Sequence, residues 1–106
     1  MSKIEIVELL PSDLPSKRFK IVVRVDDRDY TYNFGQDGSS TYIDHGDEKK
    51  RENYRRRHYA NKTEKYRIDN LIPSPALFSW KLLWGDKTDL LDNLIELQRE
   101  FNQHYK

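Results

Sequence analysis

The sequence predicts an α+β domain: a small antiparallel β-meander of about three strands, a basic helix, and a C-terminal apolar helical hairpin. Three observations predict this class. Apolar residues alternate in the first third, lysines and arginines crowd the middle, and apolar residues recur at helical spacing near the end. The 106 residues suffice for one modest core. We therefore expect one domain over residues 1–106, with the meander in 1–35, the basic helix in 44–61 and the hairpin in 74–105.

Two segments of the first third have the alternation of β-strands. Lys3–Leu10 is the first, and Pro11 ends it. Arg18–Val25 alternates more regularly, and a third strand is expected where aromatic residues share one face between Tyr30 and Phe34. The polar tetrad Asp26–Asp29 separates the last two strands, which predicts an antiparallel hairpin.

Residues 47–59 predict a helix with few apolar residues. Asp44 or Gly46 is expected to cap it. The only side chains suited to face a core are Tyr54, His58 and Tyr59. Packing would then hold this helix weakly, so we expect its charge to serve a contact outside the chain.

The C-terminal third predicts two helices after a connector over residues 61–74. Ser74 and Pro75 are typical of a helix start, and residues 76–84 are apolar nearly all round, which predicts a buried helix ended by Gly85. Thr88 is expected to cap the last helix, where apolar residues recur at helical spacing from Leu90 to Phe101.

Trp80 and Trp84 are four residues apart and therefore share one helical face. They predict a core or oligomer anchor, with a base-stacking platform as the alternative. If three strands cannot cover both C-terminal helices, the surplus apolar surface favours a homo-oligomer, with a dimer first.

The cationic run is the main functional feature. Nine of the 19 lysines and arginines lie between Lys49 and Arg67, opposed only by Glu52 and Glu64, although the whole chain carries a net charge of only +1. Such a run with interleaved aromatics is typical of a polyanion partner. The predicted phosphate contacts are Lys49, Lys50, Arg51, Arg55, Arg56, Arg57, Lys62 and Lys65, with Tyr54 or Tyr59 against sugars. The alternative is a solvated helix face neutralised by Glu52, Glu64 and the acidic last helix.

Other chemistry has weaker support in the sequence. The chain has no cysteine, so thiol nucleophiles and cysteine metal sites are excluded. His45, Asp47 and Glu48 suggest a metal-dependent nuclease as a remote option, but no second ligand group is suitably spaced. We therefore expect no enzyme, metal, cofactor or small-molecule substrate. Without a long apolar run or a signal peptide, we expect an intracellular protein and no membrane partner.

From Phe34 onward, a series of short motifs occurs in a fixed order: Phe-Gly, His-x-Asp-Glu, R-x-x-Y-x-x-R-H, Ser-x-x-x-Leu-Trp and Thr-x-Leu. With them the chain resembles a family of small uncharacterised proteins of giant nucleocytoplasmic large DNA viruses, and is similar to marseillevirus-like proteins. The matching residues are Phe34, Gly35, Gly38, Tyr42, His45, Asp47, Glu48, Arg51, Tyr54, Arg57, His58, Pro75, Ser79, Leu83, Trp84, Thr88 and Leu90.

Two segments depart from that family. Asn-Leu-Ile-Pro stands where the family has Trp-Asn-Asp-Pro, and Gly-Asp-Lys-Thr stands where it has Asn-Lys-Pro-Thr. The last helix is also longer, which suits a member-specific oligomer contact. The resemblance implies a viral origin, association with the virion or genome, and a location in the virion or in the host cytoplasm or nucleus. It carries over no catalytic residue.

These observations together predict sequence-independent binding of nucleic acid, with viral double-stranded DNA favoured, in genome packaging or organisation. The alternative is a non-enzymatic, oligomeric virion protein whose basic helix docks on an acidic protein surface.

Overall fold

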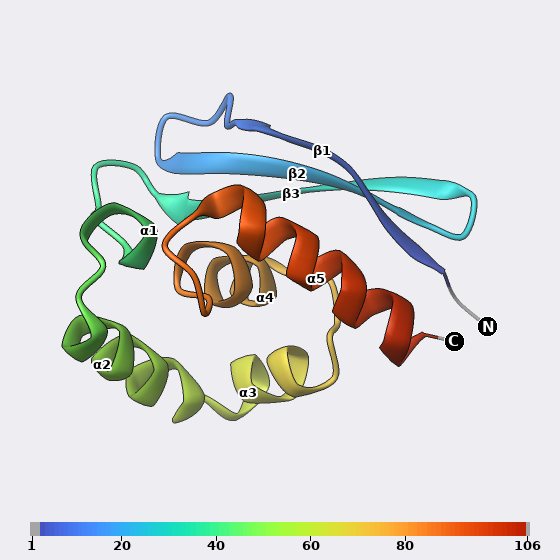
Figure 1. Cartoon of the computed structure of the whole chain (residues 1–106). Helices are drawn as coiled ribbons and strands as arrows, with labels where there is room; N and C mark the ends of the chain where they lie inside the picture. Colours follow the sequence, from blue (N-terminus) through green and yellow to red (C-terminus); the bar gives the residue numbers. More distant parts are fainter. Residues whose placement is uncertain (1–2, 106) are drawn as a thin grey trace.

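The computed structural model describes residues 3–105 and confirms the α+β class. Strands β1 (Ile4–Pro11), β2 (Lys17–Val25) and β3 (Arg28–Gln36) form an antiparallel sheet in the order β1-β2-β3, which is the expected meander. The helices all lie on one side of this sheet (Figure 1). Helices α4 and α5 lie next to the sheet, and α2 and α3 form a further layer beyond them.

The helical part begins with a short helix and contains one π-helical segment. A π-helix, labelled η1, continues directly from α4, so the two form one helical rod. The helices are α1 (Tyr42–His45), α2 (Glu48–Tyr59), α3 (Lys62–Asp69), α4 (Pro75–Phe78), η1 (Ser79–Leu83) and α5 (Leu90–His104). None of those found in residues 3–105 has the length and apolarity needed to cross a membrane.

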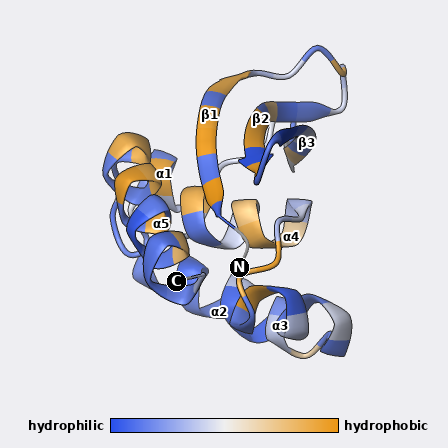
Figure 2. Ribbon diagram, turned by 90° about the vertical axis from the view of Figure 1, so that its right-hand side faces the viewer, coloured by the Kyte–Doolittle hydropathy of each residue, from blue (hydrophilic) through white to orange (hydrophobic). Residues whose placement is uncertain are grey.

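The core lies between the sheet and the rod formed by α4 and η1. Ile21, Val23 and Phe34 of the sheet are fully buried, as is Phe78 of α4, whose ring lies 5.9 Å from that of Phe34. Figure 2 shows apolar residues on β1, β2 and α4 where these elements meet. The rod is covered by the sheet, α5 and α3, and this explains why the sequence makes it apolar nearly all round.

The edge strand β1 is held by a side chain of α5. The backbone N–H of Ile6 donates to Gln98 Oε1 at 2.7 Å, and Gln98 Nε2 donates to the carbonyl of Ile4 at 2.9 Å. The strand register shifts between Ile6 and Glu8, which is a β-bulge that bends the edge. Two backbone groups of an edge strand are thus satisfied by a helix.

Several sequence-based boundaries are wrong by a few residues. The β2–β3 turn comprises only Asp26 and Asp27, and Asp26 takes a positive φ of 57° that lets β3 begin at Arg28. Asp47, instead of Asp44 or Gly46, caps α2. Asp89, instead of Thr88, caps α5 by accepting from two backbone N–H groups.

One helix is missing from the sequence-based description. The expected connector contains α3, which buries only Ile68 and therefore lacks a detectable apolar stripe. Its start has a signal, because the Asn61 side chain accepts from the N–H groups of Thr63 and Glu64 at 3.0 and 3.1 Å. Asparagine three residues before glutamate is typical of a helix N-terminus.

A buried asparagine fastens α5 to the end of the rod. Asn93 is 3% exposed, and its Nδ2 donates to the carbonyls of Leu82 and Lys87 at 3.0 and 2.9 Å. Its Oδ1 accepts from the Lys87 N–H at 3.0 Å. This side chain therefore fixes the loop between η1 and α5.

Asn93→Ala is expected to lower the free energy of unfolding by about 2–3 kcal/mol, because it leaves buried backbone groups without partners. Gln103→Ala, an exposed change on the same helix, is the control and is expected to stay within about 0.5 kcal/mol. Urea unfolding measures both variants, and equal midpoints would contradict this role of Asn93.

Candidate nucleic-acid interface

The start of α2 uses the residues that suggested a metal site. Asp47 Oδ1 accepts from the N–H groups of Lys49 and Lys50 at 2.9 and 3.2 Å, and His45 Nδ1 accepts from the Asp47 N–H at 2.9 Å. The Lys50 N–H in particular holds the pKa of Asp47 below its ordinary value. His45 and Asp47 thus serve the backbone at the turn into α2. No group of three or more metal-ligating side chains gathers among residues 3–105.

The inner face of α2 packs on the rod through aromatic rings. Tyr54 is 8% exposed and stacks on Trp84 with centroids 4.4 Å apart and planes 6° apart. Tyr59 stacks on Trp80 at 5.1 Å. Burial raises the pKa of Tyr54 above its ordinary value. The two tryptophans therefore hold α2 against the rod, and Tyr54 is not available to rest on a sugar.

Arg51 reaches from α2 to the end of the rod. Its Nε donates to the carbonyl of Gly85 at 2.8 Å and, at 3.3 Å, to that of Trp84, and a terminal nitrogen donates to Asp86 Oδ1 at 2.7 Å. Carbonyls at a helix end lack partners within the helix, and a cation there is favoured by the helix dipole. Arg51 is thus a cap for the rod, supplied by another helix.

Gly85 makes this approach possible. The residue is buried, and a β-carbon on it would lie 2.2 Å from the carbonyl oxygen of Lys81. Only glycine therefore fits between η1 and the loop that accepts Arg51.

Arg55 makes a second contact of the same kind. A terminal nitrogen donates to the Trp84 carbonyl at 3.0 Å, and its guanidinium lies 4.7 Å from the centre of the Trp80 ring. Burial and the neighbouring charge of Arg51 lower the pKa of Arg55. Its Nε is buried without a hydrogen-bond partner within the described residues. Burial of this unpartnered group costs some of the folding free energy that the other contacts of Arg55 contribute.

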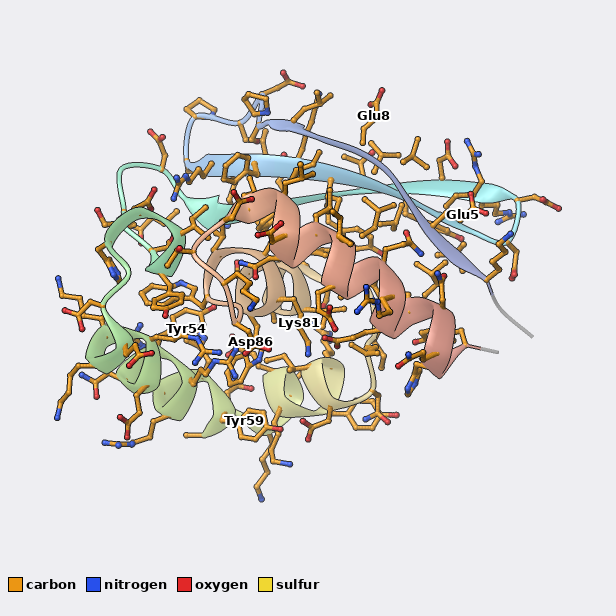
Figure 3. The ribbon with its side chains drawn as sticks, viewed as in Figure 1. Glu5, Glu8, Tyr54, Tyr59, Lys81 and Asp86 are labelled. Carbon is orange, nitrogen blue, oxygen red and sulfur yellow. The ribbon has the colours of Figure 1, made fainter. Side chains whose placement is uncertain are left out.

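These contacts correct two sequence-based expectations. Arg51 and Arg55 point into the fold (side chains 22% and 29% exposed), so they cannot be the phosphate contacts that we predicted. The acidic last helix does not neutralise the basic helix either. Glu100 pairs with Lys81 at 2.8 Å and Glu96 with Arg99 at 3.4 Å. Figure 3 shows Tyr54 beside α2, and Asp86 and Lys81 below the rod, on the side that faces α2 and α3.

The remaining cations of α2 and α3 are exposed. Arg56 pairs with Glu52 at 3.0 Å on the surface of α2, and Lys65 pairs with Asp69 at 2.8 Å on α3. Five others make no ion pair within residues 3–105: Lys49, Lys50, Arg57, Lys62 and Arg67. We call these five the unpaired cations. The fold therefore presents less free charge than the sequence suggests, but it presents that charge in its outermost layer.

A cavity of about 630 Å³ lies beside α2, on a different side of the helix from Arg51 and Arg55. It is lined by this helix, the end of the sheet and the rod. Lys50, Asn53 and Arg57, spaced by one helical turn, line it from α2. Lys17 of β2 lines the opposite rim. Sequence reasoning missed Lys17 because it lies far from the cationic run in the chain, and nothing in the sequence indicates that the two meet.

The floor of the cavity depends on a glycine. Gly35 has a φ of 79°, and a β-carbon there would lie 2.9 Å from Leu83 Cδ1. Gly35 and Leu83 both line the cavity. The end of β3 thus approaches η1 closely enough to close the cavity at its base.

His58 and Glu64 form a pair on the wall of this cavity, with His58 Nδ1 2.8 Å from Glu64 Oε2. A carboxylate only accepts, so Nδ1 carries the proton of this hydrogen bond. The other ring nitrogen, Nε2, is the one left to meet a ligand. The pair also links the end of α2 to α3.

An ion pair positions the loop at the mouth of the cavity. Arg18 of β2 donates to both oxygens of Asp44 at 2.6 and 2.7 Å, and the Thr41 N–H donates to Asp44 at 2.8 Å. These hydrogen bonds, that of Arg18 above all, hold the pKa of Asp44 well below its usual range. The loop that carries Ser39, Ser40 and Thr41 is thereby tied to the sheet.

Residues 7–58 match a family of unknown function, DUF5754. The match covers most of the sheet, α1 and nearly all of α2, and it ends before the rod and α5. Searches of curated proteins and of solved structures found no match.

Arg51→Ala is expected to lower the free energy of unfolding by about 2 kcal/mol, because hydrogen bonds from a charged group to carbonyls are lost. Arg56→Ala, which removes the same side chain from the outer face, is expected to change it by less than about 0.5 kcal/mol. Urea unfolding measures both, and an equal effect of the two would contradict the capping role of Arg51.

Asp44 is expected to contribute to acid unfolding. Its lowered pKa means that its contribution is full above the unfolded-state value of about 4 and is lost as the pH falls. Asp44→Asn should reduce stability near neutral pH and flatten the loss of stability between about pH 4 and pH 2. Urea midpoints across this range test it. Asp37→Asn, an exposed change, is the control, and a curve as steep in Asp44→Asn as in that control would refute the contribution.

Proposed function

We propose that this protein binds nucleic acid without sequence preference, through the outer face of α2 and α3. The observation that carries the proposal is the set of unpaired cations in the layer farthest from the sheet. Arg56 and Lys65 add to it, because surface ion pairs such as theirs are weak and exchange readily for phosphate. Arg51, Arg55 and Tyr54 are not part of this surface.

The shape of the surface favours backbone contacts over base readout. Two short helices joined by Ala60 and Asn61 carry the charge along their exposed sides. Lys49 and Arg56 are seven residues apart and lie on one side of α2. Side chains of this kind contact phosphates and displace counterions, which gives affinity without sequence information.

Double-stranded viral DNA in packaging or genome organisation is the target that we propose. The resemblance to proteins of giant DNA viruses supports this target, since phosphate-rich DNA is abundant where such genomes are packed. The same unpaired cations would also suit an acidic protein surface, which is the alternative partner. Both tryptophans lie within the fold, so an oligomer would need another surface; Leu91 and Ile95 of α5 are 61% and 53% exposed.

Titration of unrelated duplexes of equal length at several salt concentrations tests the proposal. The logarithm of the association constant is expected to fall linearly with the logarithm of salt, with a slope between about −3 and −5 for the unpaired cations. Lys49→Gln with Lys62→Gln should weaken binding to every duplex alike and reduce the slope by about 2.

Arg28→Gln with Arg99→Gln removes the same charge from exposed positions on β3 and α5, away from α2 and α3. This control is expected to keep most of the affinity and the slope. No binding at low salt would refute the proposal and leave the acidic protein partner. Equal losses in the two double variants would show that only net charge matters.

A further inference from the structure

We propose that the cavity beside α2 is a binding site for one nucleoside phosphate unit. The unit is either a free nucleotide or the phosphorylated end of a strand, since both present the same phosphate and planar base. Lys50 and Arg57 also belong to the unpaired cations counted above, but the other lining residues lie off the outer face, and separate variants test the two sites. It unites a cationic rim, an apolar floor with aromatic rings, and a set of neutral polar groups in one hollow.

The rim supplies the phosphate-binding charge. Lys17, Lys50 and Arg57 line the cavity from two sides, and none of the three makes an ion pair within the described residues. Among the described residues that line the cavity, Glu64 alone carries a carboxylate, and it is already bonded to His58. The cavity therefore carries an excess of uncompensated positive charge, which attracts a small anion and repels a cation.

The floor supplies an apolar surface suited to a flat ring. Phe34, Leu83, Tyr54 and Trp84 line it, and the Tyr54 ring lies between Trp84 at 4.4 Å and His58 at 4.1 Å. A base would therefore pack on the half-buried rings of Trp84 or His58, and base–aromatic packing of this kind tolerates any base. An inorganic anion would leave this apolar surface unused. The combination thus favours a ligand with both a phosphate and a ring.

Neutral polar groups also line the cavity. Ser39 and Ser40 come from the loop after β3, Ser79 from the rod and Asn53 from α2. His58, fixed through Nδ1 by Glu64, adds a ring nitrogen. Hydroxyl, amide and imidazole groups both donate and accept, which suits the sugar hydroxyls and base edges of a nucleotide.

The size of the cavity suits one nucleoside phosphate unit. Its 630 Å³ lie within the range of about 300–1,000 Å³ that is usual for small-molecule sites. The hollow is bounded by the sheet end, the loop and two helical elements, so the interior of a duplex cannot enter it, whereas a mononucleotide or a strand end can. The outer face and the cavity consequently take different parts of a nucleic acid.

Calorimetric titration of the full chain with the four ribonucleoside monophosphates tests the proposal. Inorganic phosphate and an unphosphorylated nucleoside are the comparison ligands. Saturable binding of at least one monophosphate, about tenfold tighter than either comparison ligand, is expected because both halves of the ligand make contacts. A short single strand with and without a 5′-phosphate distinguishes the two sources: a gain from the phosphate identifies a strand end, and equal affinities identify a free nucleotide.

Lys50→Gln with Arg57→Gln should weaken nucleotide binding about tenfold or more, through loss of charged hydrogen bonds. Both side chains are exposed, so the fold should tolerate the change. Lys49→Gln with Arg56→Gln removes equal charge from adjacent positions of the same helix that do not line the cavity, and should change nucleotide affinity less than about twofold. Ala76→Met, which fills the cavity without altering charge, should also weaken binding.

Three results would overturn the proposal: no saturable binding of any monophosphate at millimolar concentration, phosphate binding as tightly as the nucleotide, or equal effects of the two charge variants. The outcome of the duplex titration does not decide the outcome of the nucleotide titration. Lys49→Gln with Arg56→Gln weakens duplex binding while leaving nucleotide binding, so a failure of the outer face is distinguishable from a failure of the cavity.

Discussion

The arrangement of the helical half depends on the contact between α2 and the end of the rod. The Tyr54–Trp84 stack supplies apolar burial, and Arg51 supplies partners to carbonyls that the rod leaves open. Without this contact, little would hold α2 against the rod. The cavity would then lose the wall that carries Lys50 and Arg57. Stability of the outer layer and the geometry of both proposed sites therefore have the same physical origin.

The fold class could be predicted because the apolar residues follow two clear periods, the alternation of a strand and the spacing of a helix. Residues of β2 alternate, and the apolar residues of α5 recur at helical spacing, since each of these elements buries one face against the core. Helix α3 escaped prediction because it buries little besides Ile68 and depends on the Asn61 cap. The π-helical turn of η1 has no sequence signal, because it results from packing on several sides at once.

The candidate site was only partly predictable for a related reason. A count of charges identifies the cationic run, but it cannot tell which cations are already bound within the chain. Arg51 and Arg55 are arginines like their neighbours in the sequence, yet in the structure they donate hydrogen bonds to the carbonyls of Gly85 and Trp84. The thin apolar stripe was also misleading, because aromatic stacking and arginine–carbonyl contacts replace aliphatic packing on α2.

The geometry of a single helix then explains why the run is so dense. Arg51 and Arg55, four residues apart, share the side of α2 that meets the end of the rod. Lys50 and Arg57 share the cavity side, and the side opposite the rod remains for Lys49 and Arg56. Capping of the rod, together with the proposed binding of a nucleotide and the proposed attraction of nucleic acid, calls for positive charge on three separate sides. Consecutive cations are the consequence, because one helix of twelve residues serves all three sides.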